Sequence, residues 1–139
     1  MKRLILLAFL IFFISGLQAQ DSSKARSIKQ AEISFTEILH DFGSVNEDTT
    51  LIYRFVFYNP GQDTLRIYRL KSSWGCTAAL LSSGAIAPGD SGKIKVTFDT
   101  NGHQGPFEKT IRVYSNDVKK PVIRLIIKGQ IKSPVKNKK

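Results

Sequence analysis

The sequence contains a single cysteine, Cys76, and this scarcity excludes an intramolecular disulfide. The fold must therefore obtain its stability from packing. An odd cysteine is either buried as a small apolar residue or available for intermolecular pairing, and burial is the interpretation that we favour.

Metal ligands are scarce as well. His40, Asp41, Cys76 and His103 are the candidates, and they are scattered along the chain. Zinc sites usually use Cys and His at short recurrent spacings, which do not occur here. We therefore expect no metal site and no cofactor. In this interpretation His40 and Asp41 orient a turn at a strand end, and His103 lies in a solvated loop.

The sequence also lacks a recognisable catalytic constellation. A nucleophilic Cys76 would need a neighbouring base and a third group to orient that base, and no motif places His40 or His103 beside it. No pair of carboxylates is committed to acid–base work. We expect that the chain is not an enzyme.

Long hydrophobic runs are absent except near the N-terminus. Lys2 and Arg3 precede an apolar run over residues 4–14. This run is shorter than the roughly 20 residues of a transmembrane helix, and small residues ending at Ala19 follow it. The pattern predicts a signal peptide over residues 1–19, export to the periplasm or the extracellular space, and no transmembrane segment after cleavage. An uncleaved membrane anchor is the alternative.

Acidic residues are few, with 11 Asp and Glu against 21 Lys and Arg. Part of the basic excess belongs to residues 131–139, for which we predict a basic, disordered tail, and residues 20–30 are expected to form a flexible lead. No recognition helix is in view, so we expect no nucleic-acid partner. Residues 31–130 remain for one domain.

In residues 31–130 apolar side chains recur at every second position, which is typical of strands with one buried face. The alternation is clear at Ile33 and Phe35 and over residues 51–58, 93–99, 110–114 and 121–128. The expected core positions are Leu51, Tyr53, Phe55, Phe57, Ile94, Val96, Phe98, Ile111, Val113, Ile123, Leu125 and Ile127.

Turn residues separate these strands. Residues 40–43 (HDFG) are expected to end the first strand. Residues 59–63 (NPGQD) predict a tight turn, and hence a hairpin between the strand over 51–58 and a strand that begins at Leu65. In that arrangement Tyr58, Arg66 and Tyr68 either share an exposed recognition face or form ordinary cross-strand pairs.

About seven short strands separated by Gly and Pro turns predict an all-β fold, an immunoglobulin-like antiparallel β-sandwich. A barrel is the alternative that periodicity alone leaves open.

Several motifs together resemble a family of bacterial exported proteins, domain-of-unknown-function family 1573. The resemblance covers roughly residues 31–130 and implies an immunoglobulin-like sandwich. The motifs are HDFG at 40–43, FVFYN at 55–59 with Gly61, GCT at 75–77, IAPGD at 86–90 with Gly92, VTFDT at 96–100, GPF at 105–107 and YSN at 114–116.

One position departs from the family pattern. The family commonly has Cys-Gly-Cys-Thr, whereas this chain has Trp74, Gly75, Cys76 and Thr77. Any role that the family gives to a paired thiol is therefore in doubt here. Trp74 itself is expected either to anchor an interface or to fill buried space beside Cys76.

These observations favour an exported, non-catalytic immunoglobulin-like module that interacts with a protein or another cell-envelope component. The alternative is a periplasmic metal- or thiol-handling accessory that uses Cys76. The candidate interaction or motif residues are Trp74, Gly75, Cys76, Thr77, His40 and Asp41.

Intact mass and metal content separate these two functions. The exported protein is purified without reducing agent, beside Cys76→Ser. An interaction module predicts a metal-free monomer with an unmodified thiol. A bound metal or a disulfide-linked adduct that Cys76→Ser abolishes would instead identify the accessory.

Overall fold

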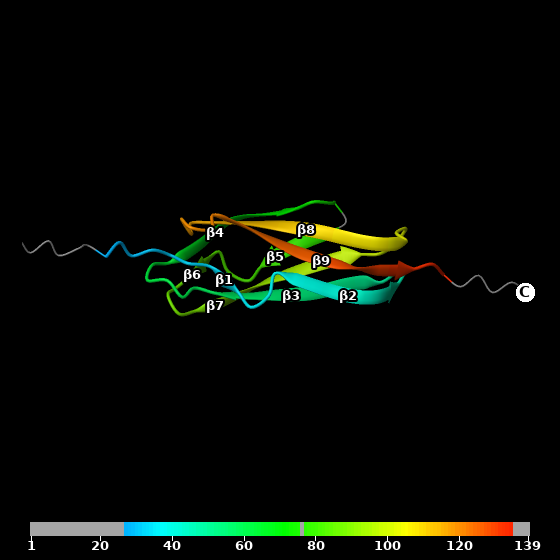
Figure 1. Ribbon diagram of the computed structural model, residues 1–139, viewed down its shortest axis with the longest axis horizontal. Coiled ribbons are helices and arrows are strands. Elements are labelled where there is room, and N and C mark those ends of the chain that lie inside the picture. Colours follow the sequence, from blue (N-terminus) through cyan, green and yellow to red (C-terminus); the bar gives the residue numbers. More distant parts are fainter. Residues whose placement is uncertain (1–26, 76, 135–139) are drawn as a thin grey trace, which may run out of the picture.

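The computed structural model describes residues 27–75 and 77–134, which form two β-sheets packed face to face (Figure 1). The first sheet has the order β1 (Ser34–Phe35), β3 (Thr50–Tyr58), β7 (Ser91–Asp99), β5 (Thr77–Leu81). The second has the order β2 (Leu39–Asn46), β9 (Val122–Lys132), β8 (Gly105–Ser115), β4 (Leu65–Ser72), β6 (Ala85–Ile86). The predicted all-β, immunoglobulin-like sandwich is confirmed.

Of the nine strands in the described residues, seven have five residues or more, which agrees with the predicted number. No helix in the described ranges has the length and hydrophobicity needed to cross a membrane. The predicted signal peptide, most of the predicted lead and the last five residues lie outside the described residues.

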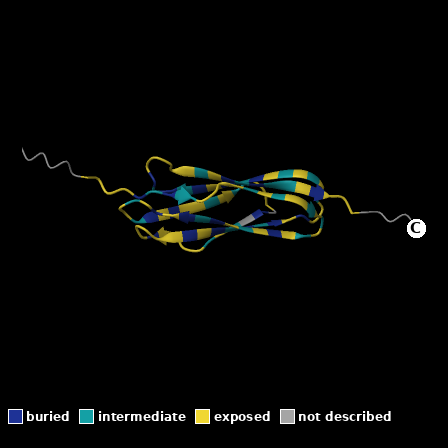
Figure 2. Ribbon diagram, turned by 60° about the horizontal axis from the view of Figure 1, so that its bottom comes forward, coloured by how far each residue is buried: buried dark blue, intermediate teal, exposed yellow. Residues whose placement is uncertain are grey.

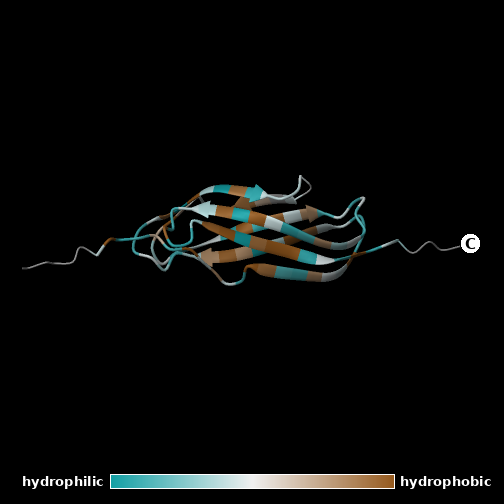
Figure 3. Cartoon of the chain, turned by 45° about the horizontal axis from the view of Figure 1, so that its top comes forward, coloured by the Kyte–Doolittle hydropathy of each residue, from teal (hydrophilic) through white to brown (hydrophobic). Residues whose placement is uncertain are grey.

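The core lies between the sheets and consists of the inward members of each alternation. Phe55, Phe57 and Phe98 of the first sheet are fully buried, as are Ile111 and Leu125 of the second. Buried and exposed bands therefore alternate along the strands, and hydropathy alternates with them (Figures 2 and 3). The predicted inward faces are confirmed.

The prediction that residues 40–43 end the first strand is wrong. The first strand, β1, pairs with β3, after which the chain crosses to the second sheet, where β2 runs parallel to β9. The HDFG motif lies inside β2 at a register shift between Asp41 and Ser44. Gly43 has φ +67°, and its N–H donates to Asp41 Oδ1 at 2.8 Å. The HDFG residues, which interrupt the apolar alternation, therefore form a β-bulge within the strand.

The predicted hairpin between residues 51–58 and the strand starting at Leu65 is also wrong. Strand β3 belongs to the first sheet and β4 to the second, so residues 59–64 connect the sheets. Tyr58 consequently lies on a different sheet from Arg66 and Tyr68, and these side chains share no recognition face.

The side chain of Asn59 explains why the chain crosses at this point. Asn59 is fully buried. Its Nδ2 donates to the carbonyl oxygens of Asp63 (2.8 Å) and Ile86 (3.1 Å), and its Oδ1 accepts from the N–H groups of Gly61 (2.9 Å) and Glu32 (3.2 Å). The amide is therefore fully satisfied by backbone groups, and it joins β3 to the N-terminal segment and to β6.

Asp117, in the loop between β8 and β9, holds the N-terminal segment from the other sheet. Its Oδ2 accepts from the N–H of Ile33 at 3.0 Å, and its Oδ1 accepts from the N–H groups of Lys119 and Lys120. Burial raises the pKa of the Asp117 carboxyl, but the three N–H donors and the charge of Lys120 outweigh it and hold the pKa below its usual range.

Strand β9 continues to Lys132, and Ile131 is buried opposite Gly105. The domain therefore extends past residue 130. Residues 131 and 132, which were predicted to belong to the tail, are part of β9.

Asn59→Asp should destabilise the domain by about 3 kcal/mol or more at pH 7, because it turns a buried donor into a charged acceptor that faces two carbonyl oxygens. The measurement is urea unfolding. Asn116→Asp is the matched control, since Asn116 makes comparable backbone hydrogen bonds but is only half-buried. Equal losses for the two variants would contradict the role given to Asn59.

Candidate functional site

Trp74 and Gly75 of the motif at residues 74–77 follow β4 in the connection that leads to β5. Trp74 is 57% exposed, which decides between the two sequence-based interpretations in favour of an accessible side chain. Gly75 is exposed, and Thr77 is buried at the start of β5. Cys76 lies outside the described residues, so its predicted burial is untested.

Trp74 packs on a lysine that the sequence analysis did not single out. Lys109 of β8 points inward and is only 7% exposed. Its Nζ lies 3.9 Å from the Trp74 ring centroid and 5.6 Å from that of Phe98. This cation–π contact keeps the indole face against the end of the sandwich. Extending the alternation of β8 back from Ile111 would have predicted that Lys109 faces inward.

His40 and Asp41 have different neighbours from the Trp74 motif. The His40 ring stacks on Tyr53 at 3.7 Å and meets the edge of Phe42, and Asp41 caps the bulge at Gly43. Asp41 thus orients the backbone locally, as expected, although within a strand. Among residues 27–75 and 77–134, no three His, Cys, Asp or Glu side chains are grouped as a metal site would require.

A row of three cations crosses the outer face of the second sheet, and the sequence analysis missed it. Lys71 on β4 lies directly opposite Arg112 on β8, and Arg112 lies directly opposite Arg124 on β9. All three residues are exposed. We call them the basic row.

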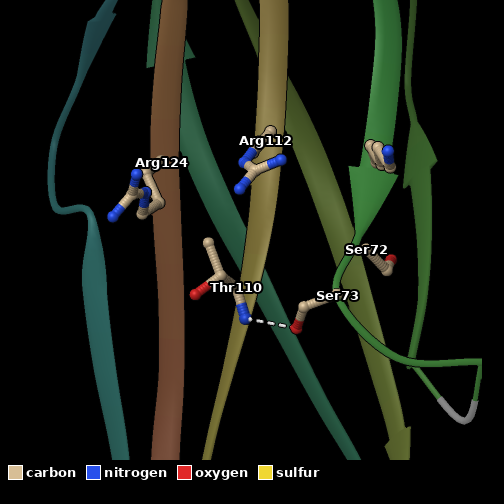
Figure 4. A pocket seen from close by; sticks show the side chains of 6 residues that line it. Ser72, Ser73, Thr110, Arg112 and Arg124 are labelled. Carbon is tan, nitrogen blue, oxygen red and sulfur yellow. Dashed lines mark hydrogen bonds between the residues drawn. The ribbon is translucent and has the colours of Figure 1, made fainter.

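The basic row lines a depression with a volume of about 390 Å³, together with Ser72, Ser73 and Thr110. Figure 4 shows Arg112 and Arg124 projecting from neighbouring strands close to Thr110 and Ser73. Among the described residues, no carboxylate lines the depression.

A serine closes one side of this depression. The Thr110 N–H donates to Ser73 Oγ at 3.1 Å (Figure 4), and the Ser73 N–H donates to the Thr110 carbonyl oxygen at 2.9 Å. Because Ser73 Oγ accepts in this contact, its hydroxyl proton can be directed to a ligand.

A second row on the same face has the opposite character. Lys128 on β9 lies between Glu108 on β8 and Asp41 on β2. Opposite charges in register stabilise a sheet, whereas like charges directly opposite destabilise it. Within the described residues, the one contact closer than 4.0 Å between a basic and an acidic side chain joins His40 and Glu37, so no ion pair neutralises the basic row.

The arrangement of the basic row suits anion binding. Guanidinium groups recognise carboxylate and phosphate oxygens with two parallel N–H donors, and lysine adds a mobile point charge.

Comparison with family models gives one match, over residues 33–131, to the family described as Protein of unknown function (DUF1573). The chain belongs to this family. The resemblance proposed from the sequence motifs is thereby confirmed. The curated proteins include no match.

Solved structures share the fold of this DUF1573 chain at low identity. A protein of unknown function from Porphyromonas gingivalis W83 has a TM-score of 0.67 at 20% identity. The match covers 78% of this chain and 51% of the P. gingivalis chain. The ASH / PapD-like domain 7 of human CEP192 has a TM-score of 0.58 at 16% identity, covering 76% and 87%. The VesB protease of Vibrio cholerae has 0.56 at 14%, covering 75% and 32%. The chain thus spans about half of the P. gingivalis protein, and these likenesses show the fold alone.

The like charges of the basic row make a testable difference to stability. Arg112→Thr removes both like-charge contacts and places a good strand former in β8, so it should stabilise the DUF1573 domain by about 0.5 kcal/mol, or raise Tm by roughly 3 °C, at low salt. The gain should shrink at high salt.

Lys128→Thr is the control, because it removes a cation that has carboxylates on both sides. It should leave Tm unchanged or lower it. A loss of stability in Arg112→Thr as large as in Lys128→Thr would show that repulsion within the basic row does not destabilise the domain.

Proposed function

We propose that the protein is an exported, non-catalytic immunoglobulin-like module that binds a negatively charged component of the cell envelope through the outer face of its five-stranded sheet. The observation that carries this proposal is the basic row, in which three exposed cations lie in direct cross-strand register without a carboxylate between them.

Electrostatics supports a binding role for this face. Like charges directly opposite one another destabilise the sheet. On the same face, Lys128 instead lies between two carboxylates, those of Glu108 and Asp41, which compensate its charge. A partner that brings negative charge would remove the repulsion on binding, so part of the cost in the free domain is recovered in the complex.

The chemistry of the candidate residues supports binding over catalysis. The His40 ring stacks on Tyr53 and meets the edge of Phe42, and the Asp41 carboxylate accepts a backbone N–H. The fold by itself does not indicate catalysis, because one fold can serve unrelated functions. A similar fold occurs in a PapD-like domain of human CEP192 and in part of the VesB protease chain.

Fractionation of an exporting bacterium tests this function. The wild-type protein should sediment with envelope membranes and be released by about 0.5 M salt, since surface electrostatics is screened there. Arg112→Thr combined with Arg124→Thr should shift the protein to the soluble exported fraction.

The matched control removes two cations from the outer face of the other sheet, Lys93→Thr with Lys95→Thr. It should still sediment. A wild-type protein that stays soluble, or a control that is released as readily as the basic-row variant, would refute the proposed function.

A further inference from the structure

We propose that the depression of the basic row binds a phosphate monoester on the headgroup of an envelope lipid. This inference rests on the proposed function and names the ligand of the same face. Three observations support it: the cations converge on one depression, their total charge is high, and apolar side chains surround them.

The geometry lets three cations reach one small anion. Neighbouring strands lie about 4.8 Å apart, and directly opposite residues on one face have Cβ atoms about 5 Å apart. Lys71, Arg112 and Arg124 therefore start within about 10 Å of one another and have long side chains that can close on a tetrahedral group. The hydroxyls of Ser73 and Thr110 lie in the same lining and supply donors that complete the oxygen contacts.

The number of charges favours a monoester. A phosphate monoester carries about −1.5 to −2 at neutral pH, whereas a diester or a carboxylate carries −1. Three cations with no carboxylate in the lining match the more highly charged group. A singly charged ligand would leave most of the repulsion within the basic row in place.

The residues around the depression favour a lipid as the source of the phosphate. Leu39 and Val122 are exposed by 43% and 47% on the same outer face, and Ile126 lies between Leu39 and Thr110 in cross-strand register. Trp74, next to Ser73, is 57% exposed. The indole covers the inward-facing Lys109 and does not line the depression, but it directly follows Ser73 of the lining in the chain, so its exposed part can reach the boundary between headgroups and acyl chains. A soluble phosphate compound would need none of these apolar neighbours.

Vesicle binding followed by Trp74 fluorescence tests the inference, because Trp74 is the single tryptophan of the chain. The mature protein is titrated with phosphatidylcholine vesicles that contain phosphatidic acid, a monoester, or phosphatidylglycerol, a diester, at matched zeta potential. We expect a blue shift of the emission and at least about tenfold tighter binding to phosphatidic acid.

Arg112→Thr and Arg124→Thr should each abolish this preference, and Lys128→Thr should keep it. Equal affinity for the two kinds of vesicle would overturn the monoester site, while salt-sensitive sedimentation with envelope membranes would still support the proposed function. Loss of the preference in Lys128→Thr as well would assign it to diffuse charge and also overturn the site.

Two further probes distinguish the source of the phosphate. Inorganic phosphate and a phosphoserine peptide are titrated while the backbone amide resonances of Ser73 and Thr110 are followed by NMR. Micromolar binding of either probe without a preference for phosphatidic acid vesicles would overturn the lipid assignment. Weak binding of the soluble probes beside tight vesicle binding is the result that we expect.

Discussion

The buried side-chain amide of Asn59 is the contact on which the arrangement of the two sheets depends. It is satisfied by four backbone groups, from its own connection, from Glu32 and from Ile86. Asp117 holds Ile33 near the same end, and at the other end the buried Thr100 hydroxyl bonds both to the Thr49 backbone before β3 and to the carbonyl oxygen of Asn46 in β2. A chain with one cysteine thus links its sheets by buried polar groups, each of which would cost free energy if it were unpaired.

This rigid frame gives the outer face of the second sheet its chemical character. Antiparallel pairing of β8 with β4 and β9 fixes which side chains lie opposite one another, and it aligns Lys71, Arg112 and Arg124. Two residues further along β9, the register instead aligns Ile126 with Thr110 and then Lys128 with Glu108. One sheet therefore carries a repulsive row and a compensated row, separated by the row of Thr110 and Ile126. This contrast is the reason to expect a ligand at the repulsive row.

Much of the fold could be predicted from local patterns. The inward faces of β3, β7, β8 and β9 follow from alternation, because side chains of a strand point to opposite faces in turn. The same residues that signal turns misled the prediction in two places. The HDFG segment forms a bulge inside β2, and the segment after Tyr58 changes sheets, because turn chemistry specifies a local bend and not the destination of the chain.

By itself the sequence determined the strand content, the buried positions and the family, since these depend on periodicity and on short motifs. It also predicted that Arg112 and Arg124 lie on strands. Only the tertiary structure decided that the three cations form one row, that Trp74 covers Lys109 and that β2 pairs with β9. These features depend on register and sheet membership, which arise from contacts between residues far apart in the chain and leave no local signature.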